Sequence, residues 1–391
     1  MRNIRAAKDT NIQQWSLKLG LICMFCIVCT GCWSKVEINE RTFITTLFVD
    51  TTDNPGEIEV TLSMPLPNRL SPEGSGTGKA PYASVSATAP TIADAIEKIQ
   101  TDLTRKISWG HTRVIVFGQD YAREGIDDTM AWISRQPLFH LSSYAMVAQG
   151  KAKDISDLTP VFEETPSDVL REFSTEENLL KTQMLNILAA DKMNQGFAAS
   201  ILDSRIKPMA SEEGETKKWV SQIGGAVFRQ MRMVDTLTEQ EARGVAWASE
   251  KLDTLTLSVR TRKQKASMSL FDMKSKIQAE LRNGEPFFTI HLTGKAELIS
   301  VIPVLKVKDV LSVKDIEQAV DEQITAYLTS ALHKAKRHGA DILSLGYRLE
   351  WRHPATWKKL RPVWNQYVKN ELQFDVHTAV DIQFVGSESS F

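Results

Sequence analysis

The residues best suited to chemistry are the four cysteines, Cys23, Cys26, Cys29 and Cys32, all near the N-terminus. Repeated Cys-x-x-Cys spacing could hold an iron–sulfur cluster, because thiolates ligate such clusters. The bacterial ferredoxin run, however, spaces its last pair by three residues and then has proline, whereas two residues intervene here and Trp33 follows. The cysteines also lie in an apolar stretch that secretion removes. We therefore expect no cluster and no cofactor.

Residues 1–31 have the composition of a secretory signal peptide. Four basic residues stand against Asp9 alone, for a net charge of +3, and the uncharged apolar run Leu19–Val28 follows. A membrane-spanning helix needs roughly 20 apolar residues. Only 16 residues separate Lys18 from Lys35, and the last of them are small or polar. A cleaved leader is therefore favoured over a permanent span.

The leader ends in Cys29-Thr30-Gly31-Cys32, which is similar to a bacterial lipobox, although Cys29 stands where leucine is usual. In that motif the cysteine sulfur takes a diacylglyceryl group, and cleavage then frees the cysteine amine for a further acyl chain such as palmitate. Two or more chains anchor a protein stably, whereas one chain binds a membrane only marginally. We predict that Cys32 is lipidated and that the mature protein has neither a disulfide nor a free thiol.

The charge balance argues against nucleic-acid binding. The chain has 47 Lys+Arg against 48 Asp+Glu, and the part from Cys32 onward has 43 basic and 47 acidic residues, a net charge of -4. No basic excess is available to displace counterions from phosphates. The basic run Arg260–Lys265 is interpreted as an exposed strand end and turn.

The sequence offers no recognisable catalytic or metal site. It has no G-x-G-x-x-G, P-loop, H-E-x-x-H or G-x-S-x-G motif. His333 and His338 are five residues apart, off the same-face helical spacing of three or four, and the pairs Glu163-Glu164 and Glu176-Glu177 flank predicted helix starts, where negative charge is favourable. We therefore predict no catalytic residue, no metal ligand and no enzymatic activity.

The first half of the chain alternates predicted strands and helices, which indicates helices packed on a sheet. Thr91 is expected to cap a helix, another helix is expected near Gly125–Ser134, and Asp154–Ile206 is expected to be largely helical, with Leu179, Met184, Leu185 and Leu188 on its core stripe. The segment Lys207–Lys218 is interpreted as a domain boundary or a long exposed hairpin. The strands are predicted at Ile44–Val49, Ile58–Met64, Ala83–Ala89, Val114–Phe117 and Ser143–Ala148.

The second half is predicted to combine long strands with one long helix. Thr238-Glu239-Gln240-Glu241 is a capping box that opens a helix. After Ser312, six apolar residues recur every three or four positions, and Gly339 suits the helix end. A helix from Pro354 is expected to break near Pro362. The strands are predicted at Val220–Phe228, Met231–Leu237, Leu255–Thr261, Met268–Leu281, Phe287–Val301 and Phe374–Phe384.

These patterns predict a multi-domain α+β lipoprotein with mixed or antiparallel sheets and packed helices. Its C-terminal domain should place a long amphipathic helix against a sheet. The expected divisions are a signal peptide at 1–31, one or more N-terminal α+β domains at 32–206 and a C-terminal α+β domain at 219–388.

Four segments resemble the Ger(x)C family of spore germination lipoproteins, the third subunits of germinant receptors. In the family's first strand a Gly-x-Asp pattern stands where this chain has Phe48-Val49-Asp50. The matching segments are Gly31–Asn39, Ile107–His111, Ile223–Phe228 with the following Glu241 and Gly244, and Gly339–Leu343 followed by Trp364 and the closing strand.

The resemblance implies a non-catalytic, membrane-anchored subunit on the outer face of the spore's inner membrane. Its implied partners are two integral membrane subunits of the same receptor, one channel-like and one transporter-like, and its implied role is assembly or signalling in nutrient-triggered germination. The alternative is a lipoprotein that binds solute for a membrane transporter, which would have two parallel α/β lobes and a hinge.

The lipidation hypothesis is directly testable. Mass spectrometry of the N-terminal peptide of the mature protein should find residue 32 first, with a diacylglyceryl thioether on Cys32. A peptide with an unmodified Cys32 would contradict it.

Overall fold

The computed structural model describes Trp15, Lys18, Gly20 and residues 37–70, 80–175, 180–209, 215–303 and 310–384. The chain divides into two compact units, residues 1–42 and 43–391. In the first, the described residues include a short 3-10 helix, η1 (Ile38–Glu40), whose Glu40 carboxylate accepts a hydrogen bond from the Glu37 amide. Apart from those first three residues, the predicted leader lies outside the described residues, as do most of the predicted loop 68–81 and Leu179.

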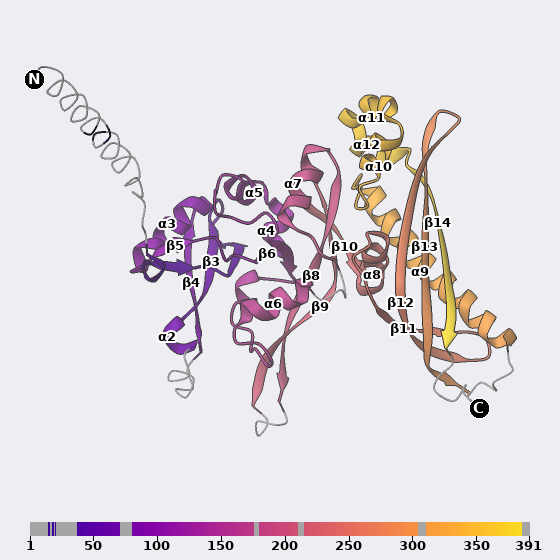
Figure 1. The fold of residues 1–391 in the computed structure, drawn as a ribbon, viewed down its shortest axis with the longest axis horizontal. Helices are drawn as coiled ribbons and strands as arrows, with labels where there is room; N and C mark the ends of the chain where they lie inside the picture. Colours follow the sequence, from indigo (N-terminus) through magenta and orange to yellow (C-terminus); the bar gives the residue numbers. More distant parts are fainter. Residues whose placement is uncertain are drawn as a thin grey trace, which may run out of the picture. The chain divides into compact units, whose positions relative to one another are not determined.

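The second unit is an α+β assembly built around two sheets (Figure 1). Its strands are β2 (Thr46–Thr51), β3 (Ile58–Pro65), β4 (Tyr82–Ala89), β5 (Lys106–Ser108), β6 (Val114–Gly118), β7 (Tyr144–Ala148), β8 (Gly196–Pro208), β9 (Thr216–Arg229), β10 (Arg232–Thr238), β11 (Leu255–Arg260), β12 (Lys265–Arg282), β13 (Glu285–Ile302) and β14 (Gln373–Phe384), with β1 (Arg41–Phe43) at the junction of the units. Its helices are α2 (Pro67–Leu70), α3 (Ile92–Asp102), α4 (Gln119–Glu124), α5 (Asp127–Ile133), η3 (Ala152–Ile155), α6 (Pro166–Thr175), α7 (Met184–Lys192), α8 (Glu239–Ala248), α9 (Val310–Arg337), α10 (Leu345–Arg352), α11 (Pro354–Leu360), η5 (Arg361–Val363) and α12 (Trp364–Asn370).

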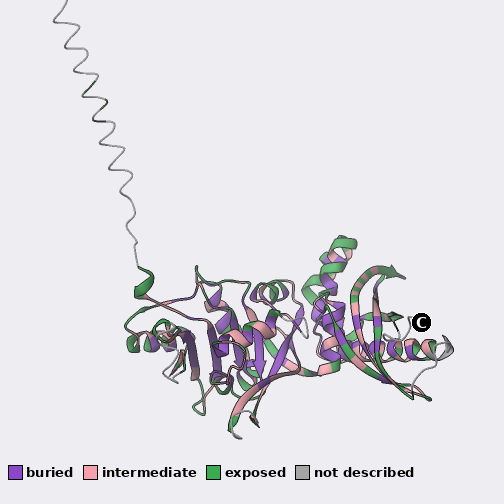
Figure 2. Cartoon of the chain, turned by 60° about the horizontal axis from the view of Figure 1, so that its bottom comes forward, coloured by how far each residue is buried: buried purple, intermediate pink, exposed green. Residues whose placement is uncertain are grey.

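The first sheet is mixed and covered on both faces. Its strand order is β10-β9-β8-β7-β6-β2-β3-β4, with parallel pairing from β2 through β6 and β7 to β8. Alternation along β6 divides its side chains, so that Ile115 and Phe117 join one core with α3, α4, α5 and α7, while Val114 and Val116 join another with η3 and α6. The central strands β2, β6 and β7 are almost wholly buried, and the middle of this sheet is purple in Figure 2, whereas β4 and β10 at its edges are partly exposed.

The described residues of the polar segment 207–218 lie on or next to two paired strands of a long hairpin, as one of the two predictions proposed. β8 pairs antiparallel with β9 from Gly196↔Arg229 to Pro208↔Thr216, and β10 follows in the same sheet. The predicted division between 32–206 and 219–388 therefore falls within a continuous sheet in the structure.

The prediction of helix up to Ile206 was wrong beyond Lys192, because residues 196–208 form β8. The first seven residues of β8 are all buried, so no polar alternation marks them as a strand. The predicted stripe around α7 was also partly wrong. Met184 and Ile187 are buried, whereas Leu185 is exposed.

The second sheet has the order β11-β12-β13-β14, antiparallel except for the parallel pair β13–β14. Helix α9 packs along β14 (Figure 1). Its predicted apolar stripe is buried in one core with α8 and the sheet. The buried stripe residues are Ile316, Val320, Ile324, Leu328, Leu332 and Ala335. Pro362 lies in η5 between α11 and α12, where the helix was predicted to break. Helix α10 was not predicted.

Side chains of α9 cover the outer edge of β14. Val380 and Ile382 donate their backbone N–H groups to the carboxylates of Asp321 and Glu317, at 2.8 and 2.9 Å. Partial burial, reinforced by the nearby Glu317 carboxylate, raises the pKa of Asp321 to about 6, although the bond from Val380 acts in the opposite direction. This sheet edge is thus closed by two carboxylates, one of which prefers to be protonated near pH 6.

Asp321→Asn should make stability less dependent on pH. The folded pKa lies above the unfolded value, so the native state takes up a proton between about pH 4 and pH 6, and the group's contribution to stability is lost as the pH rises through 6. The side-chain amide introduced by the substitution carries no charge, yet its oxygen can still accept the hydrogen bond from the Val380 N–H. Because the carboxylate is half-exposed, we expect the substitution to raise the free energy of unfolding by only about 1 kcal/mol near pH 7.5 and not at all near pH 4.5. Urea denaturation at both pH values, with the exposed Glu322→Gln as control, measures this, and equal effects at both pH values would contradict it.

Candidate functional site

Cys32, the predicted lipidation site, lies outside the described residues. Residues 31–36 of the first matching segment also lie outside them, whereas the motif residues from Glu37 onward are described. Several of these described residues hold elements of secondary structure against one another.

Glu241 and Gly244 hold α8 against α9. The predicted capping box is present: the Thr238 hydroxyl accepts from the Glu241 amide, and the Glu241 carboxylate accepts from the Thr238 amide at 2.8 Å. The same carboxylate accepts from Ser330 at 2.6 Å and pairs with Lys334 at 2.7 Å, both on α9. Burial alone would raise the pKa of Glu241, but these hydrogen bonds outweigh it and the pKa is lowered. A Cβ at Gly244 would lie 3.2 Å from the Leu328 backbone nitrogen.

Asp341 organises the helices that follow α9. Its carboxylate accepts from the Leu345 and Gly346 amides, both at 2.8 Å, and from the Trp364 indole at 2.9 Å. Burial raises the pKa of Asp341, while these hydrogen bonds act to lower it. Gly339 precedes it with φ +68°, and a Cβ there would lie 2.4 Å from the Asn365 carbonyl oxygen. The residues of this motif therefore fix α10 and α12 to the end of α9.

Asp50 plays the corresponding role in the first sheet. Its carboxylate accepts from the amides of Ala152 and Lys153 at 2.6 and 2.9 Å, and so holds η3. A Cβ at Gly118 would lie 2.1 Å from the Asp50 Oδ1. Phe48, which replaces the family's glycine, is fully buried in the core beneath η3 and α6.

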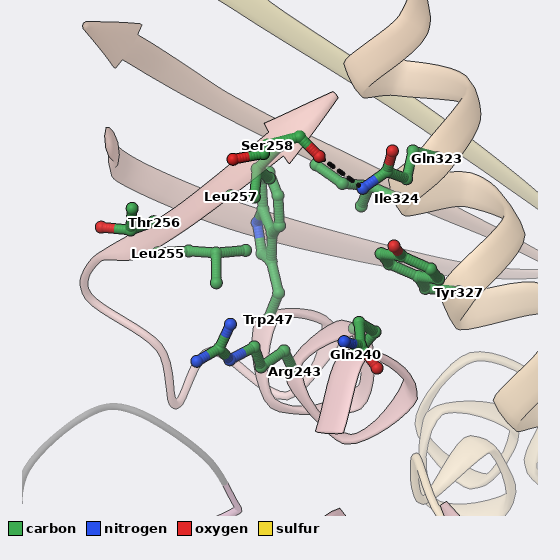
Figure 3. A pocket seen from close by; sticks show the side chains of 11 residues that line it. Gln240, Arg243, Trp247, Leu255, Thr256, Leu257, Ser258, Gln323, Ile324 and Tyr327 are labelled. Atoms are coloured by element: carbon green, nitrogen blue, oxygen red, sulfur yellow. Dashed lines mark hydrogen bonds between the residues drawn. The ribbon is translucent and has the colours of Figure 1, made fainter. Parts of the chain in front are cut away.

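A cavity of about 240 Å³ lies between α8, β11 and α9 (Figure 3). The buried Trp247 forms one wall, and its indole donates to the Lys274 carbonyl at 3.1 Å. Gln323 closes another side by donating to the Ser258 carbonyl at 3.3 Å. Arg243 is the charged residue of the lining, and it pairs with Glu239 at 2.6 Å.

This cavity lacks a carboxylate or imidazole base that could take up a proton or activate the hydroxyl groups of its lining. Its lining carries neither a carboxylate nor an imidazole, and it is smaller than the roughly 300–1,000 Å³ typical of ligand pockets. The sequence did not predict it, because its residues come from three elements and share no spacing.

The histidines are dispersed, and no group of three or more potential metal ligands occurs among the residues that the structure describes. His333 lies against the Phe374 ring, whereas His338 approaches Asp235 at 3.2 Å. Among the tryptophans near the C-terminus, Trp357 and Trp364 are buried, with ring centroids 5.2 Å apart. Trp351 is 77% exposed and lines a surface groove instead.

No helix in the described ranges has both the length and the hydropathy to cross a bilayer.

Comparison with known proteins identifies two regions of one family. Residues 34–201 match the spore germination protein N-terminal domain, and residues 223–386 match the spore germination B3/GerAC-like C-terminal domain. The chain is 24% identical to the putative spore germination protein YfkR of Bacillus subtilis (strain 168), over 90% of this chain and 92% of the relative. It is 23% identical to spore germination protein KC of the same organism, over 94% and 95%.

The fold also matches a solved structure. The crystal structure of the GerBC protein superposes with a TM-score of 0.56 at 15% identity, covering 86% of this chain and 96% of that one. The chain thus belongs to the Ger(x)C family of spore germination proteins. The predictions of the family and of an α+β fold are confirmed.

Glu241→Ala should be among the more destabilising single changes. It removes the carboxylate half of the capping box and leaves Lys334 and Ser330 without their acceptor, for an expected loss of about 2 kcal/mol. Glu241→Gln keeps one acceptor oxygen and should cost about 1 kcal/mol near neutral pH. Because the folded pKa is lowered, this difference should disappear as the pH falls below the model-compound value of 4.5. Thermal unfolding measures both.

The matched control is Glu239→Gln in the same helical turn, whose ion pair with Arg243 is more exposed. It should change stability by less than about 0.5 kcal/mol. Equal losses of stability for Glu239→Gln and Glu241→Gln would show that the contact of Glu241 with α9 does not account for the effect.

Proposed function

We propose that this protein is the lipid-anchored, non-catalytic third subunit of a spore germinant receptor, required for its assembly or signalling. The observation that carries the proposal is the ordered match of both germination-protein domains, which together extend from residue 34 to residue 386. Relatives named as germination proteins align over nearly their whole length with it.

The proposed mechanism is one of binding and positioning. A diacylglyceryl group on Cys32 would confine the body to the extracytoplasmic membrane surface, where two integral membrane subunits of the receptor would be its partners. Such confinement raises the effective concentration of one binding partner near another without any new contact. The carboxylates of Asp50, Glu241 and Asp341 support this reading, because each is engaged in holding secondary structure and none faces an open catalytic cleft.

The solute-binding alternative fits the fold less well. It would require two lobes built on parallel sheets with a ligand cleft at a hinge. The second sheet is instead dominated by the antiparallel ladder of β12 and β13, and the cavity of Figure 3 is walled by α8, β11 and α9.

Cys32→Ser tests the anchor and the function together. It should abolish acylation, move the protein out of the membrane fraction and reduce its apparent affinity for the membrane subunits by roughly 100-fold, because the effective concentration is lost. Spores carrying it should lose the response to one class of germinant, as should spores in which the gene is deleted. Membrane fractionation and germination assays measure these effects.

Cys29→Ser, three residues earlier in the leader, is the control and should leave the membrane fraction and germination unchanged. Full germination by Cys32→Ser spores would count against the anchor. Full germination after deletion of the gene, in a strain without a redundant receptor, would count against the receptor role itself.

A further inference from the structure

One edge of the second sheet is left open. β11 pairs with β12 only as far as Leu255↔Leu270, so residues 271–282 of β12 have β13 on one side and no described strand on the other. The opposite edge, on β14, is closed by carboxylates of α9. Open strand edges invite pairing with another chain, and proteins usually cover them.

The hairpin geometry shows which backbone groups face outward. Asn283 and Gly284, both with positive φ, form a two-residue turn that pairs Arg282 with Glu285. The closing pair of such a turn exchanges both hydrogen bonds, and the pattern then alternates. Ile277, Ala279 and Leu281 therefore direct their N–H and C=O groups away from β13. Pro286, which has no N–H to donate, pairs with Leu281 at one of these positions.

A groove of about 740 Å³ runs along this edge, between residues 276–280 of β12 and helix α10. Two aromatic side chains of α10 line it, Tyr347 and Trp351, which are 44% and 77% exposed. Their ring centroids are 6.2 Å apart. An extended segment placed along β12 would cover both rings.

The charge of the groove is positive and unbalanced. Its cations are Lys276, Arg348 and Arg352, against Glu280, which is already paired with Arg282 at 3.0 Å. Arg348 and Arg352 lie one helical turn apart, and like charges at that spacing are unfavourable. No carboxylate in the described ranges forms an ion pair with these three cations. From residue 345 to residue 370, six basic residues stand against Glu350 alone.

We propose that this groove binds an extended, acidic segment of a partner protein, which adds to the sheet as a strand beside β12. Main-chain hydrogen bonds to the outward groups of β12 would supply affinity. Arg348, Arg352 and Trp351 share one side of α10, so acidic side chains on the face of the segment toward α10 would pair with both arginines beside the Trp351 ring. A second copy of this chain is disfavoured, because it would bring the same three cations together. The proposal does not depend on the receptor role.

The probe is a fluorescent peptide, acetyl-Glu-Val-Glu-Val-Glu-Val-Glu-amide, which is about 23 Å long when extended. It is titrated against the full-length protein in non-ionic detergent, with anisotropy as the readout. We expect saturable binding of this peptide. A peptide with alternate amides N-methylated loses one or two hydrogen bonds, and a peptide with lysine in place of glutamate loses the ion pairs. Each should bind at least about tenfold more weakly.

Two variants separate the backbone from the charge contribution. Ala279→Pro removes an outward N–H and should weaken binding about tenfold, whereas Ala279→Ser keeps it and should bind normally. The double change Arg348→Gln with Arg352→Gln should also weaken binding about tenfold, and the lysine pair at the same positions should restore most of it. The charge-matched control is Lys358→Gln with Lys359→Gln on α11, which should have little effect.

Three results would overturn the proposal. The first is no binding of the acidic peptide, and the second is equal binding by Ala279→Pro and Ala279→Ser when circular dichroism shows both folded. The third is equal losses from the α10 and α11 charge changes, which would indicate a diffuse basic surface. Flotation with anionic phosphatidylglycerol vesicles that depends on Arg348 and Arg352, together with failure of the peptide arm, would assign the surface to lipid instead.

Discussion

The contact between α8 and α9 is the constraint on which the rest of the structure depends. Helix α8 follows directly from β10 at the end of the first sheet, yet its buried residues belong to the core of the second. The Glu241 carboxylate accepts hydrogen bonds from the cap of its own helix and from Ser330 and Lys334 of α9. Such a buried carboxylate is favourable only while every partner is in place. Gly244 then allows the two backbones to approach closely.

Much of the second half could be predicted because its patterns are strongly periodic. The capping box marks the start of α8, whereas the stripe of α9 and the alternation in β14 each report one buried face, and the structure confirms all three. Residues 196–208 could not be assigned in this way, because a strand buried on both faces loses its alternation. Helix α10 also lacks a clear signal, since its N-terminus is held by Asp341 rather than by a local cap.

The candidate sites could also be predicted from the sequence only where their residues are neighbours in the chain. A lipidation motif is contiguous in sequence, so Cys32 could be proposed from spacing alone. The cavity near Trp247 and the groove beside β12 each combine residues from separate elements, and no spacing relates them. Trp351 illustrates the difficulty, because its sequence neighbourhood resembles that of the buried Trp357 and Trp364. The side of the helix on which it lies is decided only by how α10 packs against β12.

The parallel pairing of β14 with β13 has a consequence for biosynthesis. Seventy residues separate the end of β13 at Ile302 from the start of β14 at Gln373, and the described part of this segment contains α9, α10, α11, η5 and α12. Until the C-terminal residues become available to the folding body, this flank of β13 has no strand beside it, and Asp321 and Glu317 lack the amides that later donate to them. The second sheet is therefore completed only when the last strand arrives, and until then its uncovered flank is open to mispairing with another chain.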